Sequence, residues 1–195
     1  MDEIFKAFNE QPVIWLKDRN YVITPLLDHE PETTYLLMKD VVKNLSKLTD
    51  FSKADKVVGE EDRGGYIAAL VAYANKKSLA MVKWFPIDTG KNTKIKFRSS
   101  YATGEMYLYG IKKHDRVILV EDMVDSGGTI ISMIKLLRKV GAKIIDVIVI
   151  AEKEEFKGIN RIKKETGINV KFLLKFSSVG DRSKVTWIKS KTFHG

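Results

Sequence analysis

Cysteine is absent from the 195 residues of the sequence, which excludes disulfides, thiolate metal sites and a cysteine nucleophile. Histidine is scarce: His29, His114 and His194 stand far apart, so we do not expect a metal site built from histidines. No apolar run reaches the roughly 20 residues that a membrane-spanning helix needs. The first residues, MDEIFKAFNEQ, are acidic and polar, unlike a signal peptide. We therefore expect a cytoplasmic protein without a membrane partner.

The charge of the chain is strongly basic, with a formal net charge of +9. Such a balance favours anionic partners, either nucleic acid or a phosphorylated small molecule. The lysines are spread along the chain without a basic block rich in aromatic residues, so we expect no nucleic-acid partner. Hydrophobic residues make up 44% of the chain, which is enough for a folded core.

Short apolar segments alternate with amphipathic ones, which predicts an α/β fold with a mostly parallel central sheet flanked by helices. The polar stretch 86–104 has no helical period and predicts a hairpin or a long mobile loop. We expect a core over residues 31–176, with residues 1–30 and 177–195 as additions to it. The predicted strands are 12–27 (one or two), 56–60, 79–84, 105–111, 116–122, 143–153 and 169–176, and the predicted helices are 31–48, 63–76, 127–143 and 154–166.

The segment VILVEDMVDSGGTI, from Val117 to Ile130, combines a buried strand, two acids and a glycine turn that opens a helix. Ligands bind beyond the carboxyl ends of strands in such sheets. Amide groups of glycines at a helix N-terminus bind anions. Glu121 and Asp122 would then accept hydrogen bonds from hydroxyl groups of the same ligand, which points to a sugar phosphate. The alternative is an ordinary strand, turn and helix with an acidic cap. No GK[ST] follows the glycines, so this is not a Walker A loop.

This segment resembles the motif that binds phosphoribosyl pyrophosphate (PRPP) in type I phosphoribosyltransferases. GEEDRGG, at 59–65, is similar to the pyrophosphate loop of adenine phosphoribosyltransferases, and SSYATGEMYL, at 99–108, resembles the end of the family's mobile lid. Lys83 ends the next strand, where the family carries a basic residue near pyrophosphate. The resemblance covers roughly residues 30–175.

The resemblance implies a transferase that converts PRPP and a purine base to a nucleoside monophosphate and pyrophosphate. It implies Mg²⁺, held mainly by PRPP and water, a homodimer, and a hood formed by residues 1–30 with a possible contribution from 177–195. Glu121 and Asp122 would bind the ribose and favour its cationic transition state, and Asp125 would be a general base or an acceptor at N7. The 5′-phosphate would contact Asp125, Ser126, Gly127, Gly128 and Thr129; pyrophosphate would contact Glu61, Asp62, Arg63, Gly64 and Lys83; and the lid would include Arg98 and Tyr101.

The motifs resemble two branches of the family that use different bases. The EEDRGG loop favours adenine, which we place first. Asp125 and Lys153, 28 residues apart, match the hypoxanthine-guanine enzymes, in which such a lysine donates to the 6-oxo group. The base pocket would include Met123, Val124, Glu152 and Lys153, unless Lys153 is only a surface residue. A pyrimidine-specific transferase and a regulatory protein that senses PRPP are further alternatives. We expect Trp15, Trp84 and Trp187 to pack rather than to bind the base.

Overall fold

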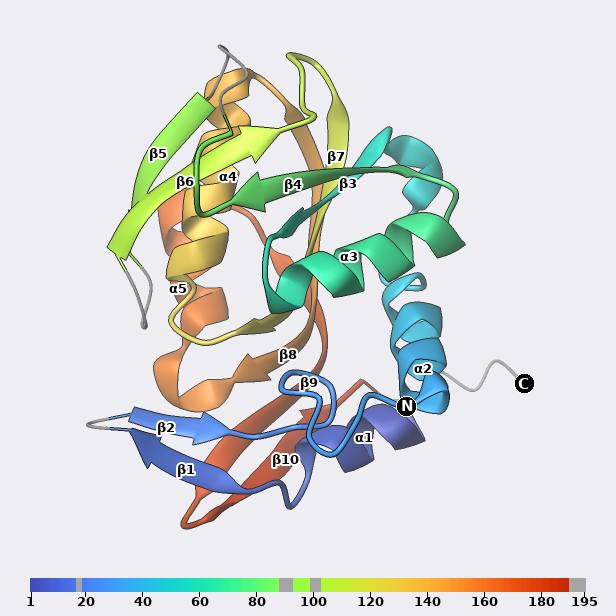
Figure 1. Ribbon diagram of the computed structural model, residues 1–195, viewed down its shortest axis with the longest axis vertical. Coiled ribbons are helices and arrows are strands. Elements are labelled where there is room, and N and C mark those ends of the chain that lie inside the picture. The colour runs from blue at the N-terminus through green and yellow to red at the C-terminus, as the bar shows by residue number, and fades with distance from the viewer. Residues whose placement is uncertain (17–18, 88–92, 99–102, 190–195) are drawn as a thin grey trace.

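The central feature of the computed structural model, which describes residues 1–16, 19–87, 93–98 and 103–189, is one twisted sheet (Figure 1). Its strand order is β10-β9-β8-β7-β3-β4-β6-β5. The five central strands run parallel, whereas β10 and β6 pair antiparallel with the outermost of them, and β5 pairs antiparallel with β6. The strands are β3 (Lys56–Glu60), β4 (Ser78–Lys83), β5 (Thr93–Arg98), β6 (Thr103–Tyr109), β7 (Arg116–Val124), β8 (Lys143–Lys153), β9 (Val170–Val179) and β10 (Arg182–Ile188).

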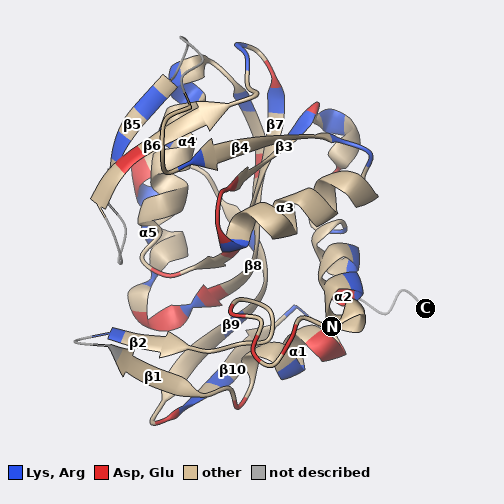
Figure 2. Cartoon of the chain, in the orientation of Figure 1, with Lys and Arg blue, Asp and Glu red and all other residues tan. Residues whose placement is uncertain are grey.

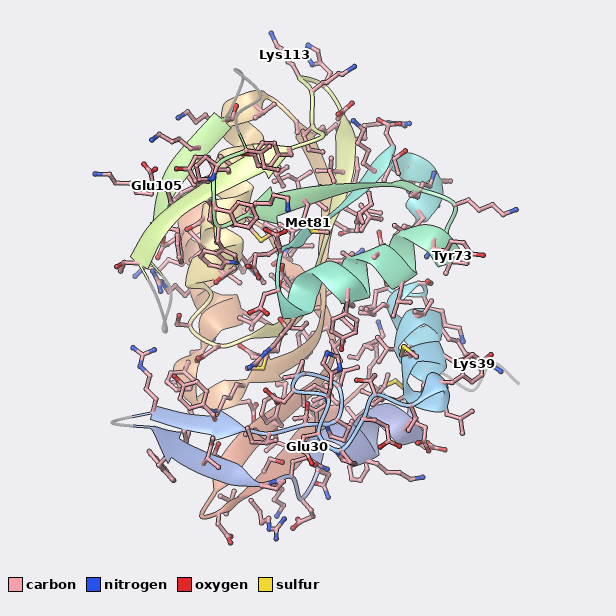
Figure 3. All side chains as sticks on the ribbon, in the orientation of Figure 1. Glu30, Lys39, Tyr73, Met81, Glu105 and Lys113 are labelled. Atoms are coloured by element: carbon pink, nitrogen blue, oxygen red, sulfur yellow. The ribbon has the colours of Figure 1, made fainter. Side chains whose placement is uncertain are left out.

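Helices cover both faces of this sheet, which explains why its central strands are apolar without alternation. Ile118 and Val120 of β7 pack in the same cluster as α1 (Asp2–Phe8), α2 (Tyr35–Leu45) and α3 (Arg63–Ala74). Val117 and Leu119 face the opposite way, toward α4 (Gly128–Val140) and α5 (Gly158–Thr166). Within this frame Figure 3 shows Tyr73 and Lys113 at the periphery and Met81, on β4, at the centre. The predicted α/β fold with a mostly parallel sheet is confirmed.

The structure adds elements to the predicted set, divides one predicted helix, and has a hairpin in the stretch for which a hairpin or a long loop was predicted. Helix α1 was not predicted, because its seven residues are too few to set a clear period. The predicted helix over 154–166 divides at Lys157, whose φ of 51° ends the short 3-10 helix η2 (Glu154–Phe156) before α5 begins. The polar stretch 86–104 contributes β5, which pairs with β6 as a hairpin; residues 88–92 and 99–102 lie outside the described part. A further 3-10 helix, η1, spans Phe51–Lys53.

The two ends of the described chain pack against each other beside the main sheet. A separate hairpin consists of β1 (Val13–Leu16) and β2 (Arg19–Val22) (Figure 1). The amide of Val13 donates to the carbonyl of Asp181 at 2.9 Å, and the buried hydroxyl of Ser183 donates to the carbonyl of Phe8 at 2.7 Å. β9 ends at Val179, beyond the predicted end of the core at residue 176, and β10 pairs with it. Part of the predicted C-terminal addition therefore extends the main sheet. The role of these segments as a hood stays a prediction. Among the described helices, none is long and apolar enough to cross a membrane.

Candidate functional site

A cavity of about 460 Å³ lies where the carboxyl ends of β3 and β7 meet the N-termini of α3 and α4. This is the position at which ligands bind in open α/β sheets. Figure 2 shows acidic residues at the turn from β3 to α3, next to the basic first residue of α3. The cavity is lined by Tyr21, Glu60, Asp62, Arg63, Trp84, Glu121, Asp122, Met123, Val124, Asp125, Ser126, Gly127, Gly128, Thr129 and Ile130.

The glycine turn between β7 and α4 is shaped by close backbone contacts. Gly127 precedes α4 with a φ of +78°, a left-handed conformation that favours glycine. Gly158, at the start of α5, packs so closely that a Cβ there would lie 2.0 Å from the carbonyl oxygen of Asp125. Arg161 Nη1 also donates to the carbonyl of Ser126 at 3.2 Å. The turn is therefore held from behind by α5 and leaves the first amides of α4 on the cavity side.

The two acids at the end of β7 are buried and point into different surroundings. Glu121 Oε1 accepts a hydrogen bond from the amide of Glu60 at 3.1 Å. A Cβ on Gly64 would lie 2.3 Å from Glu121 Oε2, so only glycine fits there while this carboxyl keeps its place. Asp122 Oδ1 accepts from the amide of Met123 at 2.6 Å. Glu121 thus ties β7 to the end of β3, whereas the backbone contact of Asp122 is with the residue that follows it.

Burial raises the pKa of both acids, and the effect differs between them. The pKa of Glu121 lies well above its ordinary value because of burial, with the charges of Asp122 and Glu60 adding to the rise. Burial also raises the pKa of Asp122, to about 6, against the lowering effect of the Met123 amide and of the charge of Arg63. A hydrogen bond between the two side chains favours neutral Glu121 and ionised Asp122. Near neutral pH Asp122 is therefore ionised, and of the two acids at the end of β7 it is the one that can act only as a hydrogen-bond acceptor.

The residues predicted for pyrophosphate divide into two groups. Asp62 and Arg63 line the cavity, whereas Glu61, Gly64 and Lys83 do not. Lys83 Nζ is paired with Glu61 Oε1. Arg63 Nη2 lies 2.9 Å from Oδ1 of Asp28, in the segment between β2 and α2. Both cations are thus engaged by acids of the chain, and an incoming anion would compete with those acids.

The residues predicted for the base also divide. Met123 and Val124 line the cavity, whereas Glu152 and Lys153, at the end of β8, do not. Glu152 is tied to structure: Oε1 accepts from the amide of Ile159 at 3.1 Å, and Oε2 lies 3.0 Å from Nζ of Lys175. The Glu152 side chain is therefore unavailable to a base.

Lys153 is 1% exposed, so the alternative of a surface lysine is wrong. Its ammonium donates to the carbonyl oxygen of Asn20 on β2 at 2.7 Å and also to the Asn20 side chain. Burial lowers the pKa of Lys153, whereas the charges of Glu155 and Asp125 raise it. The ammonium therefore sits under the N-terminal hairpin, within the electrostatic reach of a cavity residue.

Four lining residues were not predicted as site residues: Tyr21, Glu60, Trp84 and Ile130. Glu60 belongs to the quoted GEEDRGG loop, and its place directly before Glu61 was the available signal. Trp84 packs against Phe97 with ring centroids 4.3 Å apart, as expected, and lines the cavity as well. Tyr21 comes from a hairpin distant in sequence, so no local pattern marks it. Tyr101 and the side chain of Arg98 lie outside the described residues.

The cavity offers oxygen atoms that could bind a divalent cation, but its described side chains do not form a complete set of metal ligands. Mg²⁺ prefers oxygen ligands, and Asp122, the acid of this cavity that is ionised near neutral pH, is one such oxygen donor. Within the described ranges, however, no three acidic or histidine side chains converge closely enough to hold a metal ion. The cavity therefore fits a cation that arrives with the substrate and takes most of its ligands from the substrate and water.

Comparisons with known proteins identify the family of this chain. Residues 33–175 match the family described as phosphoribosyl transferase domain. The hypoxanthine/guanine phosphoribosyltransferase of Methanocaldococcus infernus is 30% identical over 174 residues, covering 89% of this chain and 94% of that protein. The protein of the same name from Methanopyrus kandleri is 31% identical over 170 residues, covering 87% and 89%.

A solved structure is similar in fold. The adenine phosphoribosyltransferase of Thermoanaerobacter pseudethanolicus superposes with a TM-score of 0.74 at 24% identity, over 90% of this chain and 99% of that one. At this identity the likeness concerns the fold alone. The matched segment contains the parallel strands, the glycine turn and the acid pair. This chain belongs to the type I phosphoribosyltransferase family.

Proposed function

We propose that this protein transfers the 5-phosphoribosyl group from PRPP to hypoxanthine or guanine, giving the nucleoside monophosphate and pyrophosphate in purine salvage. This choice reverses the order favoured by the sequence, in which adenine came first. The curated relatives at 30–31% identity are named hypoxanthine/guanine phosphoribosyltransferases, which supports the reversal. The adenine preference rested on the EEDRGG loop, which the family resemblance assigns to pyrophosphate and not to the base.

The observation that carries the choice of base is the buried ammonium of Lys153. An ammonium has three hydrogens and can only donate. Two of them are directed to the carbonyl and side-chain oxygens of Asn20, and the ammonium also lies 5.4 Å from the ring centroid of Phe156. In the proposed function the third hydrogen is donated to the base. A 6-oxo group accepts such a hydrogen, whereas the 6-amino group of adenine presents donors of its own. A lysine held in this way beside the cavity therefore favours a 6-oxopurine.

The acid pair and the glycine turn support the transfer step. The bond between C1 of the ribose and the pyrophosphate oxygen breaks, and its electron pair leaves with the pyrophosphate. A bond from C1 to the base nitrogen forms, and the base gives up its proton at N7, which Asp125 would accept. Ionised Asp122 would accept hydrogen bonds from the ribose hydroxyls, and its charge would favour the cationic sugar in the transition state. The turn from Ser126 to Thr129 would bind the 5′-phosphate, and Asp125 would accept from the base at N7.

Binding of the pyrophosphate would rearrange the two ion pairs of the β3 side. Arg63 and Lys83 are near the cavity but paired with Asp28 and Glu61. A highly charged phosphate group is a stronger partner for a guanidinium than the single carboxylate of Asp28. Mg²⁺, bound mainly through PRPP and water, would supply positive charge to the departing pyrophosphate. Closure of a lid that includes Arg98 and Tyr101, and assembly as a homodimer, stay predictions.

One assay tests this function. The protein is incubated with PRPP, Mg²⁺ and, in separate reactions, hypoxanthine, guanine, adenine, uracil or orotate, and the nucleoside monophosphate is measured. We expect product with hypoxanthine and guanine. Product with adenine alone would restore the adenine enzyme as the better assignment. Binding of PRPP without product from any base would instead favour the regulatory alternative.

A further inference from the structure

Glu60, the last residue of β3, is a buried acid to which the roles above assign no task. It lines the cavity although only 6% of it is exposed. Its Oε1 is fully covered and finds no hydrogen-bond partner among the described atoms. A buried polar group without a partner is costly, and such groups in a cavity wall are candidates for contact with a ligand. The backbone of Glu60 is fixed, because its amide donates to Glu121 Oε1 at 3.1 Å.

The surroundings of Glu60 disfavour its ionised form. Burial and, to a smaller extent, the charges of Asp62, Asp122 and Glu61 together raise the pKa of Glu60 to about 8. The charged or titratable groups around it on the packed elements are Glu61 and Asp62 of the following loop, Arg63 of α3, Lys83 of β4, and Glu121 and Asp122 of β7. At neutral pH Glu60 is therefore mainly a neutral carboxylic acid, which has one hydrogen to donate.

We propose that Glu60 is a further substrate-binding residue whose neutral carboxyl donates a hydrogen bond to a pyrophosphoryl oxygen of PRPP. The inference rests on the proposed function, since it takes PRPP as the ligand. Glu60 begins the loop Glu60–Gly64, whose position between β3 and α3 suits an anion. An ionised carboxylate at this place would repel the pyrophosphate, whereas a neutral one supplies the donor that the anion lacks.

This assignment gives the cavity acids opposite tasks. Asp122, with a pKa of about 6, is ionised above neutral pH and accepts from ribose hydroxyls. Glu60, with a pKa of about 8, keeps its proton and donates. Environments that separate the pKa values of neighbouring carboxyl groups commonly separate their roles as well. One cavity can thus bind the sugar hydroxyls and the anionic phosphates of a single ligand.

The test measures PRPP binding by calorimetry in the absence of base, with Mg²⁺ present, from pH 7 to pH 9. Phosphate groups of this kind lose their last proton near pH 6, so the ligand's charge changes little over this range. The variants are Glu60→Gln, which keeps a neutral donor of the same shape, and Glu60→Leu, which removes it. Glu32→Gln, at an exposed position before α2, is the control for the change in net charge. The Tm of each variant is measured alongside.

We expect Glu60→Leu to weaken PRPP binding at pH 7 by about tenfold or more, as for loss of a hydrogen bond to a charged partner. Glu60→Gln should bind as the unaltered protein does at pH 7. Its affinity should stay constant above pH 8, where that of the unaltered protein falls. Equal weakening by both variants, or no weakening by Leu, would overturn the role of Glu60 alone. Failure of the unaltered protein to bind PRPP would overturn this role and the proposed function together, whereas binding without conversion of any base would contradict only the proposed function.

Discussion

The cavity has two sides that are built in different ways. The sugar-phosphate side, formed by the end of β7, the glycine turn and the loop after β3, is shaped by backbone contacts and by glycines that tolerate no side chain. The side proposed for the base, where Tyr21 of the β1–β2 hairpin lines the cavity, depends on side chains, above all on the contact between Asn20 of this hairpin and Lys153 at the end of β8. In the proposed function the first side binds PRPP and the second side binds the base.

The difference predicts how each side responds to mutation. A change on the sugar-phosphate side should affect the reaction with every base to the same degree, because PRPP is common to all of them. A change on the base side should affect the bases unequally and leave PRPP binding intact. The variants below separate these two patterns, beginning with the largest expected effect.

Asp122→Asn should lower kcat by about 10²-fold or more with every base, because it removes a negative charge that favours the cationic sugar. The fold should persist, since the amide oxygen of asparagine can still accept from Met123 N. Steady-state kinetics with hypoxanthine and with guanine measure the effect, and circular dichroism checks the fold. Unchanged turnover would refute the role of Asp122 at the ribose.

Lys153→Met should lower kcat/KM for hypoxanthine by roughly 10- to 100-fold, as for loss of a charged hydrogen bond of about 1.5–3 kcal/mol, with little change for adenine. Lys171→Met is the matched control, because Lys171, on β9, pairs with Asp146 of β8, and neither residue lines the cavity. Equal losses for hypoxanthine and adenine would mean that Lys153 supports the hairpin and does not contact a 6-oxo group.

Gly158→Ala should destabilise the protein by about 1–3 kcal/mol and raise the KM for PRPP, because the added Cβ would push on the carbonyl of Asp125 behind the glycine turn. Gly167→Ala, at the other end of α5, is the control. Gly167 has a φ of +74° with open space around it, so alanine there should cost about 1 kcal/mol and leave the KM unchanged. Denaturation and kinetics on both variants test this. A similar KM for PRPP in the Gly158→Ala and Gly167→Ala variants would show that the glycine turn does not depend on its contact with α5.

The pH dependence of stability should reveal the acids of the sugar-phosphate side. The pKa values of Glu60, about 8, and Asp122, about 6, lie above the ordinary 4.5 and 3.8. The folded protein therefore keeps protons that the unfolded chain has lost, and its free energy of unfolding falls as pH rises from about 4 to 8. Asp122→Asn should flatten the lower part of this slope and Glu60→Gln the upper part. Urea denaturation without ligand measures the slope; identical slopes in all three proteins would contradict the assignment.

The same two-sided construction explains what could be predicted from the sequence. The strand, the acid pair and the glycine turn follow one another within Val117–Ile130, so spacing alone placed them together. The burial of Lys153 under Asn20 depends on residues 133 positions apart, and no local pattern indicates it. Tyr21 reaches the cavity by the same long-range packing. Glu60 was missed for a different reason: a glutamate at a strand end is ordinarily exposed, and only the fold shows that this one is buried.

The most direct test of the proposed base preference is a competition in one vessel. Hypoxanthine and adenine are supplied at equal concentration with Mg²⁺ and limiting PRPP, and the two nucleotide products are separated and quantified. Their ratio equals the ratio of the kcat/KM values and does not depend on enzyme concentration. We predict that inosine monophosphate exceeds adenosine monophosphate, and that Lys153→Met brings the ratio down. An excess of adenosine monophosphate from the unaltered protein would contradict the account.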